Sequence, residues 1–326
     1  MVDLSVKYMG MSLPSPLILG SCSLSNTVKN LQEAEKAGFG AIVLKSVFEE
    51  EIKTEIASSF QQVDTHAHAQ AIDYVSRYQE IACLEKHAKQ VREACQAVNI
   101  PIIASINCFS AEGWTSYAKM LEEAGANALE INYFLLPSDF DKTADEYTAP
   151  CFKLVENLKK EIKIPVALKT SFYFTDLARI MQKLSYAGWD ALVLFNRFYL
   201  PDIDLKNMKF FLSGHLSTPD DLLNTLRWVG LLSEHLTCDI AATTGCHDAN
   251  GLIKLLLAGA DSVQAASVFY QKGLSYASEM LNELKKWMEE NEYQSIDAFK
   301  AKMNYTRVEN PAAYFRVQFM KYVSEL

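Results

Sequence analysis

Two lysines and three asparagines stand at equivalent places in this sequence, at or just after the ends of short apolar runs. The lysines are Lys45 and Lys169, and the amides are Asn107, Asn132 and Asn196. Short apolar runs are typical of buried strands in a parallel sheet, whose carboxyl ends meet at one edge. We therefore expect two cations and three amides to converge on one site. Such a set suits a ligand that carries negative charge together with carbonyl and amide groups.

The isoalloxazine ring of a flavin has this chemistry. Its reduced form is anionic near N1 and C2=O, and a lysine placed there stabilises that charge. We therefore interpret the set as a binding site for a flavin.

A short phrase that recurs four times predicts the elements that position these residues. Its copies are Ala37–Ala41, Ala124–Ala128, Ala187–Ala191 and Ala258–Ser262. In each copy a glycine ends a helical pattern, as glycine often does in the left-handed conformation, and an apolar run follows. Repeated helix–glycine–strand units indicate parallel βα winding.

Eight strands are predicted along the chain. They are Leu17–Leu19, Ala41–Lys45, Ile102–Ile106, Ala128–Asn132, Val166–Lys169, Ala191–Phe195, Asp239–Ala242 and Ser262–Ala265. Helical patterns lie between them, including Ser116–Ala124, Asp176–Tyr186 and one that begins at Thr218. Eight such units predict a (β/α)8 TIM barrel, and we expect residues 1–326 to form a single domain.

A flavin nucleotide also needs a cradle for its phosphate. Barrels often bind phosphate after strands seven and eight, where backbone N–H groups are accessible. Three segments of small residues are candidates, and they are Ser213-Gly214, Thr243-Thr244-Gly245 and Ala266-Ser267.

Composition narrows the class of protein. The chain has 326 residues, 49% of them hydrophobic, and a formal net charge of -9, which disfavours nucleic acid and anionic membranes as partners. We find no signal peptide and no apolar run long enough to span a bilayer. The seven cysteines are scattered without a C-x-x-C spacing, which predicts a cytoplasmic protein with no metal site of its own.

One connection is far longer than a βα unit needs. About residues 46–100 separate the second and third strands, and they include Glu49-Glu50-Glu51, His66 and His68. Long loops in compact domains are usually functional, so we interpret this insertion as a lid over the strand ends. The three glutamates are interpreted as a solvated face.

Several of these segments resemble the dihydroorotate dehydrogenase family of FMN-dependent barrels. Pro16–Ser21 resembles the family's opening strand, and Gly40–Ser46 resembles its segment with the active-site lysine. The strands that end in Asn132 and Lys169 are similar to those that contact flavin, and Asn196 falls where the family has another Asn. The resemblance implies an enzyme that oxidises dihydroorotate to orotate in pyrimidine biosynthesis, with Lys45 and Asn132 catalytic and Ser21 among the flavin contacts. It also implies the soluble class and a homodimer.

The sequence departs from the family after Asn132. The family carries a Cys or Ser base there, followed by Pro-Asn, and this chain has Leu135 at the place of the base and Pro137 at that of the Asn. A leucine cannot accept a proton. The departure predicts that FMN binding is retained, whereas the substrate can differ from dihydroorotate and be another pyrimidine-like compound. Candidates for the missing proton acceptor are Tyr133, Tyr173, Cys108, His66 and His68.

Two other functions are compatible with the same residues. A barrel enzyme without flavin would use Lys169 to form a Schiff base with a carbonyl substrate. A flavin-binding protein without catalysis would explain Leu135.

Overall fold

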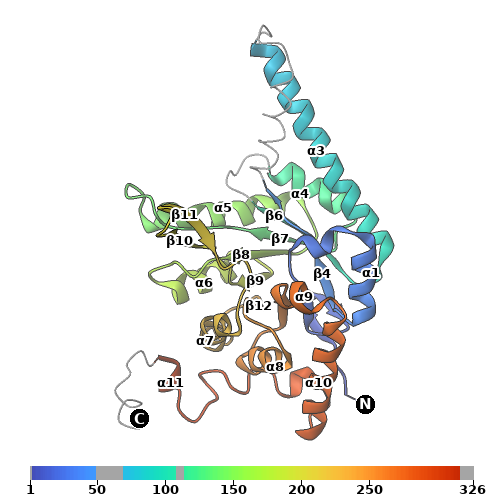
Figure 1. Ribbon diagram of the computed structural model, residues 1–326, viewed down its shortest axis with the longest axis vertical. Coiled ribbons are helices and arrows are strands. Elements are labelled where there is room, and N and C mark those ends of the chain that lie inside the picture. Colours follow the sequence, from blue (N-terminus) through green and yellow to red (C-terminus); the bar gives the residue numbers. More distant parts are fainter. Residues whose placement is uncertain (1, 49–68, 108–113, 316–326) are drawn as a thin grey trace.

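Eight parallel strands close into a barrel in the computed structural model, which describes residues 2–48, 69–107 and 114–315 (Figure 1). This confirms the predicted (β/α)8 architecture. The strands are β3 (Leu17–Leu19), β4 (Ala41–Val43), β6 (Ile102–Asn107), β7 (Ala128–Asn132), β8 (Val166–Thr170), β9 (Ala191–Leu194), β12 (Asp239–Thr243) and β13 (Ser262–Ala265). All eight overlap the predicted strands.

The barrel closes because β4 pairs both with β3 and with β6. The second strand is interrupted after Val43 and resumes as β5 (Val47–Phe48), which pairs with the far end of β6. Every pairing within the barrel is parallel, as the winding of βα units requires.

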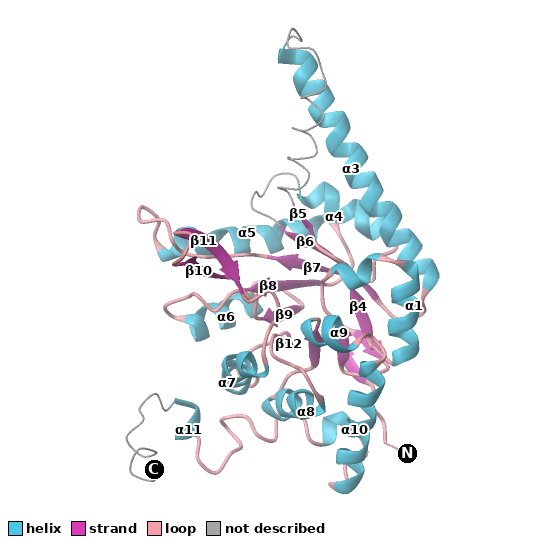
Figure 2. Ribbon diagram, viewed as in Figure 1, coloured by secondary structure: helices cyan, strands magenta, loops and turns pink. Residues whose placement is uncertain are grey.

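Helices surround the strands (Figure 2). They are α1 (Val28–Ala37), α3 (Ala69–Ala97), α4 (Trp114–Glu123), α5 (Ala144–Glu161), α6 (Leu177–Tyr186), α7 (Leu222–Leu232), α8 (Ala249–Ala258), α9 (Ser267–Lys272) and α10 (Tyr276–Glu290). The helix expected at Thr218 starts as a 3-10 turn at Pro219–Asp221 and continues as α7. Near the C-terminus lies the short α11 (Ala312–Phe315). Nowhere in the described chain is a helix long and apolar enough to cross a membrane.

Three of the four recurring phrases do more than end a helix. Their fourth residues are Asn127, Asp190 and Asp261, and each of these side chains accepts a hydrogen bond from the backbone N–H of the first or second residue of the preceding strand. The distances are 2.8, 2.7 and 2.7 Å, to Ile102, Val166 and Ile240 respectively. Each of these three phrases thereby fixes one strand to its neighbour at the amino end of the barrel.

A hairpin covers that amino end. It consists of β1 (Val6–Tyr8) and β2 (Met11–Leu13), and its Tyr8 and Leu13 are buried. The N–H of Met9 donates to the Asp239 carboxylate at the start of β12. The carboxyl end of the barrel is therefore the end that can be open to ligands.

A second hairpin was not expected from the sequence. Strands β10 (Leu200–Asp204) and β11 (Lys209–Ser213) pair antiparallel between β9 and α7. The first of them contains Pro201 and two aspartates, residues that are depleted in strands, so the pattern did not indicate one. Its ends bring Tyr199 and His215 to the mouth of the barrel.

The long connection after β4 is only partly described. Its helix α3 packs against α1 and α4 and extends beyond them, as Figure 1 shows. The glutamate run from Glu49, together with His66 and His68, lies outside the described residues, so the predicted lid stays a prediction.

Candidate active site

A cavity of about 660 Å³ opens at the carboxyl ends of the strands. The predicted site residues that line it are Ser21, Lys45, Asn107, Asn132, Lys169, Asn196, Thr243, Thr244, Gly245, Ala266 and Ser267. Ser213 and Gly214 are not among its lining residues. They lie at the end of the hairpin, where Ser213 donates to the carbonyl of Leu200 and the Gly214 carbonyl accepts from Arg197. Five different strands thus bring the two lysines and the three asparagines to one cavity.

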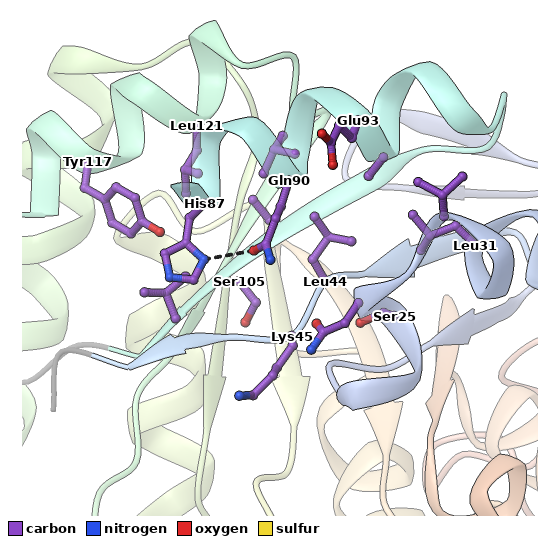
Figure 3. A pocket seen from close by; sticks show the side chains of 16 residues that line it. Ser25, Leu31, Leu44, Lys45, His87, Gln90, Glu93, Ser105, Tyr117 and Leu121 are labelled. Carbon is purple, nitrogen blue, oxygen red and sulfur yellow. Dashed lines mark hydrogen bonds between the residues drawn. The ribbon is translucent and has the colours of Figure 1, made fainter. Parts of the chain in front are cut away.

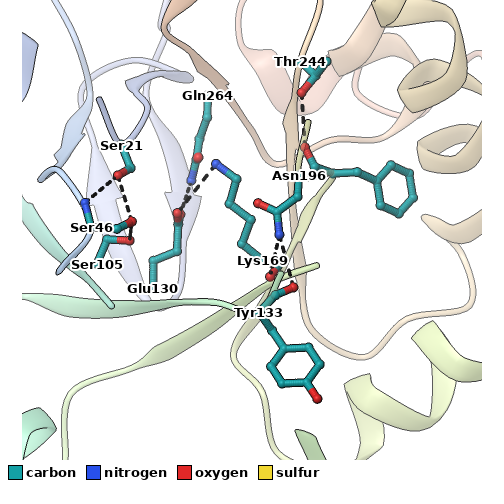
Figure 4. Close-up of polar contacts among 10 residues, drawn as sticks. Ser21, Ser46, Ser105, Glu130, Tyr133, Lys169, Asn196, Thr244 and Gln264 are labelled. Carbon is teal, nitrogen blue, oxygen red and sulfur yellow. Dashed lines mark hydrogen bonds and ion pairs between the residues drawn. The ribbon is translucent and has the colours of Figure 1, made fainter. Parts of the chain in front are cut away.

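Register explains why Asn132 and Lys169 lie together. They are paired residues on β7 and β8. The side-chain amide of Asn196, just after β9, donates to the backbone carbonyls of Tyr133 at 3.2 Å and Lys169 at 3.3 Å. Asn196 therefore ties the segment that follows β7 to the carboxyl end of β8 (Figure 4).

A buried carboxylate lies beside Lys169. The side chain of Glu130 is 1% exposed, and its Oε1 is 3.8 Å from Nζ of Lys169, which is 13% exposed. Its Oε2 accepts a hydrogen bond of 2.6 Å from Nε2 of Gln264, a residue of β13 (Figure 4). Three strands supply this group, which we call the Glu130 triad.

Three serine hydroxyls form a chain on another wall. The hydroxyls of Ser21 and Ser46 are 3.0 Å apart, and those of Ser46 and Ser105 are 2.7 Å apart. The N–H of Ser46 also donates to Ser21. These bonds fix the backbone that follows Lys45.

Lys45 lies between two cavities. Besides the main one, it lines a space of about 50 Å³ between the barrel and its helices, together with His87 and Gln90 of α3 (Figure 3). The His87 ring nitrogen Nδ1 and the Gln90 amide oxygen are 3.1 Å apart. The small space has room for water but not for a flavin.

Unpaired acceptors in the main cavity indicate a ligand with donors. The side-chain oxygens of Asn107, Asn132 and Gln264 are buried and find no hydrogen-bond partner among the described residues. Such atoms are costly when they stay unpaired. The isoalloxazine of FMN presents both an N–H donor and several acceptors, and amides can satisfy both kinds. The cavity volume also falls within the range usual for cofactor sites, so the residues fit FMN.

The turn after β12 lines the cavity and packs closely against the backbone at the start of α7. Thr244 and Gly245 have φ of 79° and 81°, in the left-handed region. A Cβ at Gly245 would lie 2.1 Å from the backbone nitrogen of Leu222. Only glycine fits between this helix start and the cavity.

Hydroxyl groups join the loops near that turn. The hydroxyl of Ser267 accepts from the N–H of Ser217 at 2.9 Å, and the hydroxyl of Ser217 is 3.0 Å from Nε2 of His247. Burial lowers the pKa of His247. These small and polar groups are the part of the cavity suited to a phosphate.

The candidate proton acceptors are poorly placed or not described. Tyr133 donates its hydroxyl to the carbonyl of Tyr147 at 3.2 Å, and burial raises its pKa well above the ordinary value. Tyr173 lines an adjoining pocket of about 250 Å³ instead of the main cavity. Cys108, His66 and His68 lie outside the described residues. None of the described candidates is therefore placed to accept a proton from a substrate in the main cavity.

Leu135 is buried and is not a lining residue of the cavity. Its carbonyl accepts a 2.8 Å hydrogen bond from Ser171. The neighbouring Phe134 lines the cavity instead. The segment after Asn132 therefore contributes an aromatic surface where the resemblance implies a base.

Other lining residues were missed by the sequence reading, notably Ser46, Arg197, His215 and Gln264, and so was Glu130 behind Lys169. Glu130 and Gln264 interrupt apolar runs that otherwise indicate fully buried strands, and this interruption is the signal that could have revealed them. The described residues contain no group of three or more His, Cys, Asp or Glu side chains that could hold a metal ion.

Comparison with known proteins agrees with this geometry. The sequence model of the family described as dihydroorotate dehydrogenase matches residues 3–288. The catalytic subunit of dihydroorotate dehydrogenase B (NAD(+)) from Thermoplasma volcanium is 25% identical over 312 residues, 91% of this chain and 97% of the relative. That of Methanocaldococcus jannaschii is 23% identical over 298 residues, 88% of this chain and 94% of the relative. Dihydroorotate dehydrogenase A (fumarate) from Lactobacillus delbrueckii is 25% identical over 185 residues, 55% of this chain and 60% of the relative. Since the family match spans most of the chain, the protein belongs to the dihydroorotate dehydrogenase family and is an oxidoreductase of that type.

Proposed function

We propose that this protein is an FMN-dependent oxidoreductase that acts on a CH–CH bond of a small planar substrate, dihydroorotate or another pyrimidine-like compound. The observation that carries the proposal is the cavity in which Lys45, Lys169 and three asparagines meet, with buried amide oxygens that have no hydrogen-bond partner among the described residues. Bound FMN would supply the hydride acceptor.

The chain's own residues would hold the cofactor and orient the substrate. Lys169, Asn107 and Asn132 supply charge and amide groups for the ring, and the turn at Thr244-Gly245 with Ser267 supplies backbone and hydroxyl groups for the phosphate. Lys45 and Asn132 contact the substrate, in keeping with the resemblance. Phe134 provides an apolar wall.

The relatives support a place in pyrimidine biosynthesis, since their names specify dihydroorotate. Their description as NAD(+)-linked catalytic subunits supports a protein that works together with other chains, and we propose that this chain also forms a homodimer. We place it in the cytoplasm and propose neither a nucleic-acid nor a membrane partner.

The Schiff-base alternative is weaker. Lysines that form Schiff bases are activated by desolvation or by another cation. Lys169 instead faces the carboxylate of Glu130. Borohydride trapping with aldehydes and ketones would reveal that chemistry if it occurs. The second alternative is a flavin-binding protein without catalysis. It predicts that no pyrimidine substrate reduces the bound flavin.

The visible absorption spectrum of the purified protein is the first test. We expect flavin bands, either as isolated or after FMN is added, and bleaching when dihydroorotate is added without oxygen. If the flavin bands persist after dihydroorotate is added, the cofactor assignment stands and dihydroorotate is not the substrate. A protein that stays colourless with added FMN would refute the proposal.

A further inference from the structure

Glu130 is a charged side chain in the middle of a strand whose other residues are apolar up to Asn132. It lies inside the barrel, 1% exposed, and burial of a carboxylate is costly unless charge and hydrogen bonds compensate it. A residue of this kind needs a structural or functional explanation. The explanation must lie in its two partners, Lys169 and Gln264.

The two partners satisfy the carboxylate unequally. Gln264 donates a 2.6 Å hydrogen bond to Oε2, whereas Lys169 faces Oε1 at 3.8 Å, too far for a hydrogen bond. Oε1 has no hydrogen-bond partner among the described residues. Gln264 thereby fixes the carboxylate, and the carboxylate attracts the ammonium without binding it tightly.

We propose that Glu130 is a positioning residue that restrains Lys169 and lowers the redox potential of flavin bound in the cavity. This inference rests on the proposed function, because it concerns the cofactor site. A positive charge near N1 of the ring stabilises the anionic reduced form. The Glu130 carboxylate opposes that effect, since it offsets part of the lysine's charge and attracts its ammonium toward the barrel interior.

The substitution E130Q tests the charge while it keeps the shape and the acceptor for Gln264. Sulfite adds to oxidised flavin and creates the same negative charge on the ring, so its dissociation constant is a second measure besides the potential. We expect sulfite to bind E130Q about tenfold more tightly than the unaltered protein, and the potential to rise by the equivalent of about 30 mV for a two-electron couple. Either quantity unchanged, or shifted in the opposite sense, would overturn the inference.

Glu156→Gln is the matched control. Glu156 is exposed on α5 and pairs with Lys160, so the same charge is lost outside the barrel. We expect neither sulfite affinity nor potential to change in this variant. A shift as large as that of E130Q would mean that net charge, and not the Glu130 triad, sets the potential.

A double-mutant cycle in the FMN-free protein tests the pair independently of the cofactor. K169M leaves the buried carboxylate without its cation, and we expect a clear fall in the midpoint of urea unfolding. E130Q/K169M should recover most of that fall, because the unpaired charge is gone. Additive losses would refute the coupling. If the unaltered protein binds no FMN, the proposed function fails, and the cycle still decides whether the two side chains are coupled.

Discussion

The carboxylate of Asp190, at the start of β9, accepts a 2.7 Å hydrogen bond from the backbone N–H of Val166, the first residue of β8. Lys159 of α5 pairs with the same oxygen. Asn127 and Asp261 make the same backbone bond at two other strand starts. The amino end of the barrel is therefore held by a repeated side-chain hydrogen bond as well as by the backbone hydrogen bonds between its strands.

Replacement of Asp190 by alanine should lower the free energy of unfolding by about 1 to 2 kcal/mol, because a charge-assisted hydrogen bond is lost and an N–H is left without an acceptor. Urea denaturation measures this. Asp190→Asn keeps a hydrogen-bond acceptor and removes the charge. Its loss of unfolding free energy should therefore be less than half that of the alanine variant. Equal losses in both variants would assign the effect to Lys159 instead of Val166.

The stability of the protein should depend on the protonation of Asp239. Burial, together with the charge of Asp261, raises the pKa of Asp239 from 3.8 to about 6. The folded state binds this proton more tightly than the unfolded chain does. The protonated Asp239 therefore contributes its full stabilisation to the folded state below about pH 4, and this stabilisation is lost as the pH rises through 6.

Asp239→Asn does not titrate at this position. Relative to this variant, the unaltered protein should lose roughly 1 to 2 kcal/mol of unfolding free energy between pH 4 and pH 7. This loss is smaller than the pKa shift alone would give, because the Asp239 side chain is partly exposed to solvent. Urea unfolding of both proteins at several pH values provides the comparison. Asp141→Asn, in an exposed loop, is the control. Parallel pH profiles for the unaltered protein and Asp239→Asn would contradict the assignment.

Gly245→Ala should destabilise the protein by more than about 3 kcal/mol and abolish FMN binding. The new Cβ would meet the Leu222 backbone at 2.1 Å in addition to the strain of a positive φ. Gly10→Ala is the matched control, since Gly10 has φ of 72° and nothing within 4 Å of a Cβ. That variant should lose only about 1 kcal/mol. Thermal unfolding and FMN titration distinguish the two.

Restoring a hydroxyl at the position of the family's base should not restore a base. Leu135 is 6% exposed and is not a lining residue of the cavity, so Leu135→Ser should destabilise the protein by about 2 to 4 kcal/mol without faster flavin reduction by dihydroorotate. Leu136→Ser makes the same change at an exposed neighbour and should cost little. Anaerobic stopped-flow measurements would contradict the prediction if Leu135→Ser reduced its flavin faster.

The sequence predicted the barrel because four of its eight strands follow a helix and a glycine in the same order, a local signal repeated along the chain. It predicted the convergence of Lys45, Asn132 and Lys169 because strand ends meet in any such barrel. It did not predict the hairpin of β10 and β11, whose Pro201 and aspartates carry no strand signal. Nor did it predict the Glu130 triad, since residues far apart in sequence become partners only through closure of the barrel.

Val43 of β4 pairs with Ile103, and Val47 of β5 pairs with Ile106. Four steps along one strand thus match three along the other, which is a bulge with one extra residue. In a regular strand neighbours face opposite sides, yet Lys45 and Ser46 both line the main cavity. The bulge therefore lets two consecutive polar side chains, those of Lys45 and Ser46, line the cavity. Deletion of one residue between Val43 and Val47 would restore the regular alternation, and only one polar side chain would then face the cavity.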